Sequence, residues 1–244
     1  MKEVSPHLAE FHSIPELCDL LASRRAVGRS GKVFTGLGAL STVNNLITLR
    51  RLMLHLKPKR TLEVGLCFGG SCLVFTGCHR DLHAPPVRQH VALDPFQQTV
   101  WDDAGLMAVE NAGLAGYLDF RPGFSSLELA ALVREGRQFD LIYIDGSHLF
   151  EDVFVDFYFT VRLLSLGGVA ALDDCADPNI AKVLRFVGKN MSNSIEKLNL
   201  APYRPDGGRS LKYRLAHALG RTQLRAYRRI GEVQRSWDAP FTDF

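Results

Sequence analysis

The sequence predicts an α/β protein built on a doubly wound, mostly parallel sheet. Short apolar segments alternate with stretches long enough for one helix, and glycine, proline or aspartate bounds each segment. Such segments are typical of parallel strands that are buried on both faces of a sheet. Strand and helix alternating five times favour a doubly wound sheet, in which the carboxyl ends of the strands share one ligand-binding edge.

The expected elements begin with an N-terminal helical cap over residues 1–59. Its two helices are expected at about 14–26 and 41–56, with a glycine-rich loop between them, and Ser41 and its neighbours are expected to close the ligand pocket. A core of residues 60–215 follows. Its first five strands are expected at 60–65, 89–94, 117–121, 139–145 and 168–173.

The clearest expected helix starts near Phe150. Its apolar residues recur at spacings of three and four, which places them on one face, and the acids in its first turn suit the helix dipole. Gly167 and Gly168 are expected to end this helix. Two last strands are expected at 194–200 and 210–215.

Residues 216–244 are expected to form a basic C-terminal tail. Arg225, Arg228 and Arg229 would share one face of a helix there. This pattern fits a solvated helix face, and it also fits an interface with an anionic partner. The N-terminal helices and this tail are the candidate interfaces of a homo-oligomer.

Composition predicts a soluble globular protein of the cytoplasm. Of the 244 residues, 46% are hydrophobic and 23% are charged. No apolar run approaches the ~20 residues that span a bilayer, and the N-terminus lacks a signal-peptide pattern, so no membrane partner is expected. The net charge of +3 is too small to indicate nucleic acid. The five cysteines form no C-x-x-C pair and are interpreted as reduced thiols.

Residues 61–71 read T-L-E-V-G-L-C-F-G-G-S and predict a strand, a glycine-rich turn and a helix. The turn departs from G-x-G-x-x-G because Cys67 replaces the middle glycine, and no Gly-Lys-Ser/Thr follows, so it is poorly suited to phosphate. Glu63 lies two residues before Gly65. Asp94 comes about two dozen residues after the turn, where an acid can bind ribose hydroxyls. A positively charged nucleoside without phosphate would suit this turn.

Carboxylates end four of the five strands: Glu63, Asp94, Asp145, and Asp173 with Asp174. A single acid of this kind is often a helix cap, but four strand ends on one edge predict contact with a ligand. Asp145, Asp173 and Asp174 follow neighbouring strands and would repel one another without a cation. Their oxygen ligands favour Mg²⁺, Ca²⁺ or Mn²⁺. The alternative, in which these acids cap a helix and contact the cofactor without a metal, stays open.

The residues also resemble a known family. Glu63-Val64-Gly65 with Gly69-Gly70-Ser71, followed by Asp94, resembles motifs I and II of class I S-adenosylmethionine (SAM)-dependent methyltransferases. The segments F-D-L-I-Y-I-D-G-S-H-L-F-E-D-V-F-V-D and L-L-S-L-G-G-V-A-A-L-D-D are similar to a more specific branch. That branch includes O-methyltransferases of the macrocin and mycinamicin type and a methyltransferase-like protein of cephalosporin biosynthesis. The resemblance covers about residues 40–190.

The resemblance implies a seven-stranded, Rossmann-like methyltransferase sheet and O-methylation of a small hydroxylated metabolite. It places the turn of Gly65, Gly69 and Ser71 under the methionine part of SAM, and Glu63 near its ammonium group. Asp94 would bind the ribose. Further cofactor contacts are implied for Gly123, Phe124 and Asp145, although Phe124 also fits simple packing.

Related metal-dependent enzymes imply a divalent ion, Mg²⁺ in the first place, on Asp145, Asp173 and Asp174. His148 lies three residues after Asp145, where a lysine is the proposed base in plant-type enzymes. An imidazole can accept a hydroxyl proton at neutral pH, so His148 is the expected base and Asp145 its catalytic neighbour. The alternative for His148 is a role in starting the following helix.

Three other functions fit the sequence less well. A nicotinamide-dependent oxidoreductase is disfavoured by the missing G-x-G-x-x-G pattern. A non-catalytic module of the same fold would bind a partner through the arginine tail. Methylation of RNA or protein is disfavoured by the modest charge. The substrate itself is not specified, because the regions expected to build its pocket, 1–59 and 175–215, carry only a coarse pattern.

Overall fold

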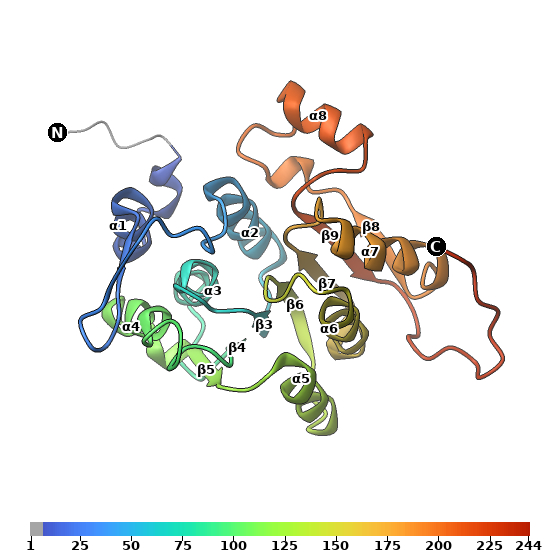
Figure 1. The fold of residues 1–244 in the computed structure, drawn as a ribbon, viewed down its shortest axis with the longest axis horizontal. Coiled ribbons are helices and arrows are strands. Elements are labelled where there is room, and N and C mark those ends of the chain that lie inside the picture. Colours follow the sequence, from blue (N-terminus) through green and yellow to red (C-terminus); the bar gives the residue numbers. More distant parts are fainter. Residues whose placement is uncertain (1–6) are drawn as a thin grey trace.

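The computed structural model describes residues 7–244, so the first six residues of the expected cap lie outside it. Seven strands form one sheet in the order β5-β4-β3-β6-β7-β9-β8 (Figure 1). Five are parallel, and β9 runs antiparallel to both of its neighbours. The strands are β3 (Thr61–Val64), β4 (His90–Leu93), β5 (Leu118–Arg121), β6 (Phe139–Ile144), β7 (Leu164–Leu172), β8 (Ile195–Leu198) and β9 (Arg225–Arg229). This confirms the predicted Rossmann-like, seven-stranded sheet.

Helices cover both faces of the sheet (Figure 1). The helices are α1 (Pro15–Ser23), α2 (Val43–Leu56), α3 (Gly70–Asp81), α4 (Ala104–Asn111), α5 (Ser125–Arg134), α6 (Phe150–Leu163), α7 (Pro178–Asn190) and α8 (Leu211–Ala218). Alternate strand residues divide between two cores: Leu141 and Val169 pack with α1 to α4, whereas Ile142 and Ala170 pack with α5 to α7. Among the described residues, no helix is long and apolar enough to cross a membrane.

Residues 7–59 contain both expected helices, and the glycine-rich loop between them forms a hairpin. The two strands are β1 (Arg25–Val27) and β2 (Val33–Thr35). Arg29 at the hairpin turn forms ion pairs with Asp103 at 3.0 Å and with Glu110 at 2.9 Å. The chain then crosses the carboxyl edge of the sheet, where buried Leu37 and Leu40 hold it before α2 begins. This crossing brings Ser41 to the candidate site.

Two boundaries differ from the sequence-based expectation. Helix α6 ends at Leu163, and β7 begins directly at Leu164, before the two glycines that were expected to end the helix. The pairing of β6 with β7 shifts register between Phe139 and Leu141, and Gly167 lies in this irregular stretch with φ +83°. Gly167 therefore adopts the left-handed backbone conformation that the irregular start of β7 requires.

The C-terminal segment differs most. The strand expected at 210–215 is helix α8, which Ser210 caps by accepting a hydrogen bond from the backbone of Tyr213. Part of the expected tail is instead strand β9, inserted between β7 and β8 with Ala226 and Tyr227 buried. The arginine side chains of β9 therefore do not share a helix face. Long-range pairing with two strands overrides the local helical spacing.

Candidate active site

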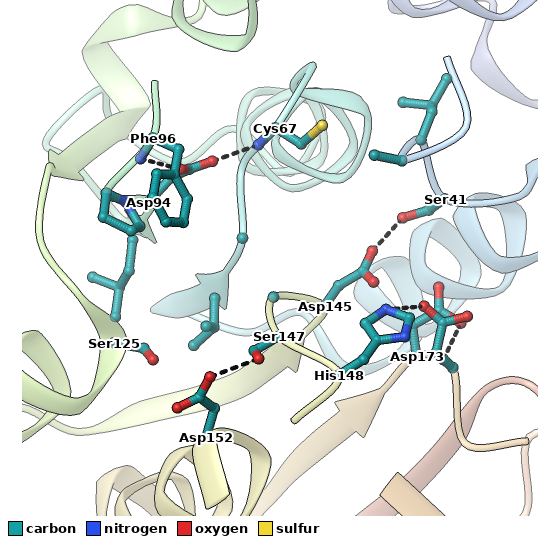
Figure 2. A pocket seen from close by; sticks show the side chains of 18 of the residues that line it. Ser41, Cys67, Asp94, Phe96, Ser125, Asp145, Ser147, His148, Asp152 and Asp173 are labelled. Carbon is teal, nitrogen blue, oxygen red and sulfur yellow. Dashed lines mark hydrogen bonds and ion pairs between the residues drawn. The ribbon is translucent and has the colours of Figure 1, made fainter. Parts of the chain in front are cut away.

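A cavity of about 690 Å³ opens at the carboxyl edge of the sheet (Figure 2). Its walls come from the loops that follow β3, β4, β6 and β7, from the start of α5 and from the crossing segment before α2. Ligands bind at this edge in doubly wound sheets. The cavity has two sides: one formed by the glycine turn, Asp94 and Phe124, and the other by Asp145, Asp173, Asp174 and His148.

The glycine turn brings the ends of β3 and β6 together. Gly65 lines the cavity with φ +92°, and a Cβ there would lie 2.2 Å from the backbone oxygen of Asp145. Gly69 has φ +81° and precedes α3, in close contact with the backbone of Gly105. Ser71 is buried in the first turn of α3. Of the three predicted turn residues, Gly65 lines the large cavity and the other two shape the turn behind it.

Asp94 is held by the turn that it faces (Figure 2). Its Oδ2 accepts hydrogen bonds from the backbone N–H of Leu66 at 3.2 Å and of Cys67 at 2.8 Å, and from Nε2 of Gln97 at 3.0 Å. Its Oδ1 accepts one from the backbone N–H of Phe96 at 2.7 Å. The carboxylate is buried and lines the cavity. Asp94 therefore fixes the shape of the turn as well as facing the predicted ribose position.

Glu63 does not line this cavity. It is fully buried on the opposite side of the strand, where its Oε1 lies 3.1 Å from Nε2 of His90. Within residues 7–244, Glu63, Cys72 and His90 are the one group of three potential metal ligands whose atoms lie within 4.8 Å of one another. All three are buried between α3, which carries Cys72, and the sheet, and none lines the cavity. Strand alternation turns the side chain of Glu63 toward α3 and away from the cavity, and its expected contact with the cofactor ammonium stays a prediction.

Two phenylalanines form the rim beside Asp94. The rings of Phe96 and Phe124 meet edge to face with centroids 6.0 Å apart, and both side chains are exposed. Phe124 lines the cavity at the start of α5, and its contact with a nucleobase stays a prediction. Gly123 is not part of the wall, and the side chain of Glu128 occupies the space beside it.

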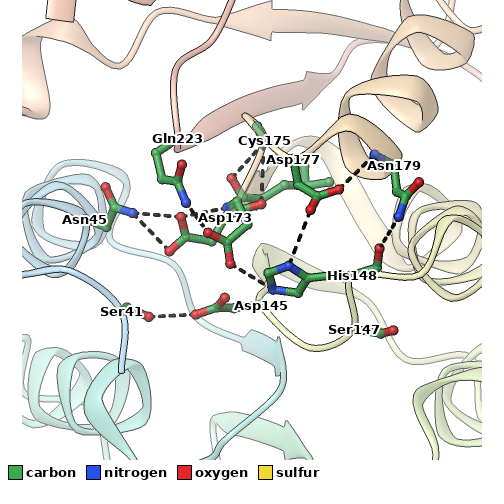
Figure 3. A network of polar contacts seen from close by, with 12 residues as sticks. Ser41, Asn45, Asp145, Ser147, His148, Asp173, Cys175, Asp177, Asn179 and Gln223 are labelled. Atoms are coloured by element: carbon green, nitrogen blue, oxygen red, sulfur yellow. Dashed lines mark hydrogen bonds and ion pairs between the residues drawn. The ribbon is translucent and has the colours of Figure 1, made fainter. Parts of the chain in front are cut away.

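On the other side, the carboxylates of Asp145 and Asp173 share the phenol of Tyr143. Figure 3 shows Ser41 beside Asp145 and Asn45 beside Asp173. The hydroxyl of Tyr143 lies 3.0 Å from Oδ2 of Asp145 and 2.7 Å from Oδ2 of Asp173. Ser41 donates to Asp145 at 2.6 Å, and the amide of Asn45 donates to both oxygens of Asp173, at 2.7 and 3.0 Å. Tyr143 has one proton for two carboxylates, so one of these contacts needs a further proton or a cation.

The pKa shifts of Asp145 and Asp173 agree with this shortage of protons. Burial, together with the charge of Asp173, raises the pKa of Asp145 from 3.8 to about 7. Burial also raises the pKa of Asp173. Their hydrogen-bond donors, Ser41, Asn45 and Tyr143, are neutral, so the negative charge of the pair is not balanced by these contacts. A divalent cation bound by carboxylate oxygens would relieve it.

Asp174 contacts His148 rather than the other two carboxylates. Its Oδ2 lies 3.0 Å from Nε2 of His148, and its Oδ1 accepts a hydrogen bond from the amide of Gln223. Nδ1 of His148 lies 3.8 Å from Oδ2 of Asp177, and the amide of Asn179 donates to the backbone oxygen of His148 at 3.1 Å. In the described part of the chain, the three predicted metal ligands do not converge within 4.8 Å.

Sequence reasoning missed three polar residues of this side. Tyr143 lies near the end of β6, two residues before Asp145, which directly follows the strand. The two-residue period of a strand would have placed it on the same side as that carboxylate. Asn45 and Gln223 come from segments far away in the sequence, and no local pattern marks them. They reach the site because α2 crosses the sheet edge and because β9 pairs with β7.

Comparison with known proteins agrees with this geometry. Residues 62–175 match a family described as a methyltransferase domain. Caffeoyl-CoA O-methyltransferase 1 of Eucalyptus globulus is 28% identical over 129 residues, which are 52% of this chain and 48% of that protein. A caffeoyl-CoA O-methyltransferase of Eucalyptus gunnii matches equally well. The chain thus spans about half the length of the curated relatives it matches.

Solved structures share the fold over most of the chain. The O-methyltransferase TomG from Streptomyces achromogenes, in complex with SAM, has a TM-score of 0.60 at 17% identity and covers 80% of this chain and 83% of that chain. An O-methyltransferase from Bacillus cereus, in complex with SAH, has a TM-score of 0.61 at 15% identity and covers 90% of both chains. The fold that the sequence resemblance implied is therefore confirmed.

Proposed function

We propose that the chain is a SAM-dependent O-methyltransferase of a small hydroxylated metabolite, on the basis of the match of residues 62–175 to a methyltransferase domain. One observation carries the proposal. A single cavity joins the turn organised by Asp94 to the carboxylates and the imidazole of His148. A nucleoside cofactor and a polar substrate would lie face to face in such a space, which is the arrangement that group transfer requires.

The cofactor side is proposed to hold the nucleoside and methionine parts of SAM. Asp94 would accept hydrogen bonds from the ribose, and the exposed rings of Phe124 and Phe96 would cover the adenine. Gly65 allows close approach to the turn because it has no side chain. Bound SAM supplies a methyl group that its sulfonium already activates, so alignment and exclusion of water are the tasks left to the protein.

His148 is proposed to take the proton of the substrate hydroxyl as the oxygen bonds to the methyl carbon. Nε2 of His148 lies 3.0 Å from Asp174. In the neutral tautomer that carries its proton on Nε2 and donates it to this carboxylate, Nδ1 would be the accepting nitrogen. Asp174 and Asp177 would then stabilise the imidazolium that forms, because both carboxylates lie beside the ring. The sequence-based alternative, a structural role at the start of α6, would give His148 no effect on turnover beyond folding.

Asp145 and Asp173 are proposed to hold a divalent cation, Mg²⁺ in the first place, with Asp174 as a further ligand. Their donor set is all oxygen, and their buried negative charge lacks a balancing cation. A bound cation would lower the pKa of a coordinated substrate hydroxyl. Asn45 and Tyr143 orient the Asp173 carboxylate through hydrogen bonds.

Calorimetry with SAM and S-adenosylhomocysteine tests the central proposal. Both are expected to bind the full chain with one site, and Asp94→Ala is expected to weaken binding about a thousandfold. Turnover is then sought with methyl-labelled SAM against a panel of catechols and phenolic thioesters, because the similar Eucalyptus proteins are caffeoyl-CoA O-methyltransferases. Failure of both ligands to bind at millimolar concentration would end the proposal.

The cation is tested separately by thermal unfolding. Mg²⁺ or Mn²⁺ is expected to raise the unfolding midpoint of wild-type protein, and this increase is expected to disappear in Asp173→Ala. EDTA is expected to abolish turnover, and added Mg²⁺ to restore it. Full turnover in EDTA would reject the cation while leaving the methyltransferase proposal intact.

A further inference from the structure

A second cavity, of about 330 Å³, lies away from the candidate active site. It is enclosed by α6, by α7 and by the C-terminal segment that follows β9, and its walls are mostly apolar. Figure 1 shows this segment leaving β9, looping away from the body and returning to α7. The apolar lining consists of Phe154, Phe157, Tyr158, Val183, Phe186, Val187, Met191 and Val233. The volume lies within the range of small-molecule sites.

The outer wall of this cavity is anchored at both ends. After β9, the backbone N–H of Ile230 donates to the backbone oxygen of Ser194 at 2.8 Å. At the far end, the side chain of Asn190 forms two hydrogen bonds with the backbone of Thr242, at 2.8 and 2.9 Å. Nearby, Lys189 donates to the backbone oxygen of Asp243 at 2.7 Å. The segment between these anchors, residues 230–243, is thus fixed at both ends, and we call it the strap.

Two arginines contribute the charge of the cavity. Arg162 extends from the end of α6, stacks 3.5 Å above the ring of Tyr158 and donates to its backbone oxygen at 2.7 Å. Arg235 lies on the strap and donates to the backbone oxygen of Pro240. No Asp or Glu lines the cavity. Over residues 7–244, neither guanidinium has a carboxylate within 4.0 Å.

We propose that this cavity binds a small apolar carboxylate. The ligand's apolar part would lie among the aromatic and aliphatic side chains, and its carboxylate would pair with Arg162 and Arg235. A guanidinium accepts a carboxylate in a two-point hydrogen bond, which gives the site its preference for this anion. A neutral ligand would leave both guanidinium groups without a charged partner, and a cationic ligand would be repelled. The proposal does not depend on the methyltransferase function.

Isothermal titration of the full chain with three ten-carbon probes tests the preference. Sodium decanoate is expected to bind with one site and at least about tenfold more tightly than decan-1-ol, because a hydrogen bond to a charged group is stronger. Decyltrimethylammonium is expected to show no binding. Shortening the carboxylate to octanoate is expected to weaken binding about fourfold per methylene removed. Absent or non-saturable decanoate binding, or equal affinity for decanoate and decanol, would overturn the proposal.

Substitutions locate the site. Arg162→Met keeps the apolar stem over Tyr158 and is expected to reduce decanoate affinity about tenfold while leaving decanol unchanged. Arg185→Met, on α7 but outside the cavity lining, is the matched control and is expected to bind as wild type. Val183→Phe is expected to remove binding of both probes by filling the cavity. Wild-type decanoate affinity in Arg162→Met would contradict the assignment.

A variant at an exposed position distinguishes loss of ligand recognition from a folding defect. Arg235 lies on the strap and is exposed, so Arg235→Met is expected to keep the wild-type unfolding midpoint and still lose part of the preference for decanoate over decanol. Each variant is therefore measured by thermal unfolding before titration. If Arg235→Met and Arg162→Met both fold and both retain the full preference, the guanidinium groups do not recognise the carboxylate, and the proposal fails.

Discussion

The two sides of the large cavity differ in how their acids are satisfied. Asp94 accepts four hydrogen bonds, three of them from backbone N–H groups and one from a neighbouring amide side chain. Asp145 and Asp173 share the single proton of Tyr143 and otherwise receive neutral donors. Hydrogen bonds from the chain itself satisfy the carboxylate of the first side. The second side carries negative charge that only a further proton or a bound cation would neutralise.

This difference explains why the two sides are expected to respond differently to change. A carboxylate that accepts hydrogen bonds from backbone amides holds a binding site in shape, so its loss weakens ligand binding. Neighbouring carboxylates repel each other, so their protonation state depends on pH and on bound cations. The four predictions below separate these two behaviours, starting with the largest expected effect.

Asp94→Ala is expected to weaken SAM binding about a thousandfold. The substitution leaves the backbone N–H groups of Leu66, Cys67 and Phe96 without their charged acceptor, and each such hydrogen bond contributes about 1.5–3 kcal/mol. Calorimetry measures the loss. Asp119→Ala, at a half-buried position on β5 outside the cavity, is the control. If Asp94→Ala binds SAM within tenfold of wild type, the turn keeps its shape without this acid.

His148→Ala is expected to reduce kcat about a hundredfold while leaving SAM affinity unchanged, because a positioned base typically contributes at least this much to proton transfer. Steady-state kinetics and calorimetry on the same preparation measure both quantities. His217→Ala, on α8, is the matched control. An equal loss of SAM affinity and of kcat would assign His148 to the shape of the site rather than to proton transfer.

Phe124→Ala is expected to weaken SAM binding about tenfold, since an aromatic contact of this kind is worth about 0.5–1.5 kcal/mol. The exposed ring carries little of the stability of the fold, so the unfolding midpoint is expected to stay the same. Leu127→Ala, in the first turn of the same helix and outside the cavity lining, is the control. Unchanged affinity would mean that Phe124 only packs against Phe96.

Asp145→Asn is expected to change the pH dependence of stability. In the metal-free chain the pKa of Asp145 is about 7, against 3.8 when unfolded, so the folded chain holds an extra proton between about pH 4 and pH 7. The free energy of unfolding therefore falls as pH rises through this range. Thermal unfolding of wild type is expected to lose about 5 °C between pH 5 and pH 7.5.

The variant isolates this contribution. Burial also raises the pKa of Asp156, to about 6, which gives a slope of the same sign in wild type and variant. Asp145→Asn is therefore expected to have a shallower dependence, not a flat one. Mg²⁺ is expected to reduce the slope of wild type in the same way. Identical slopes in wild type and variant would show that Asp145 carries no extra proton.

The sequence by itself determined the sheet and most of the site. Apolar runs predicted the five parallel strands nearly at their observed positions, because buried strands need uninterrupted apolar residues. The acids at the strand ends predicted where Asp94, Asp145, Asp173 and Asp174 lie, because parallel strands end at one edge. His148 was predicted beside Asp145, and it lines the same cavity.

Only the tertiary structure decided which way side chains point and which distant segments meet. Glu63 looked like a cofactor residue from its place before Gly65, yet its side chain turns toward α3 and His90. The arginines at 225–229 had a helical spacing, yet pairing with β7 and β8 places them in a strand of the sheet. Asn45 and Gln223 join the site from opposite ends of the chain. Long-range packing settles these features, and a local pattern contains no information about the partner that packs against it.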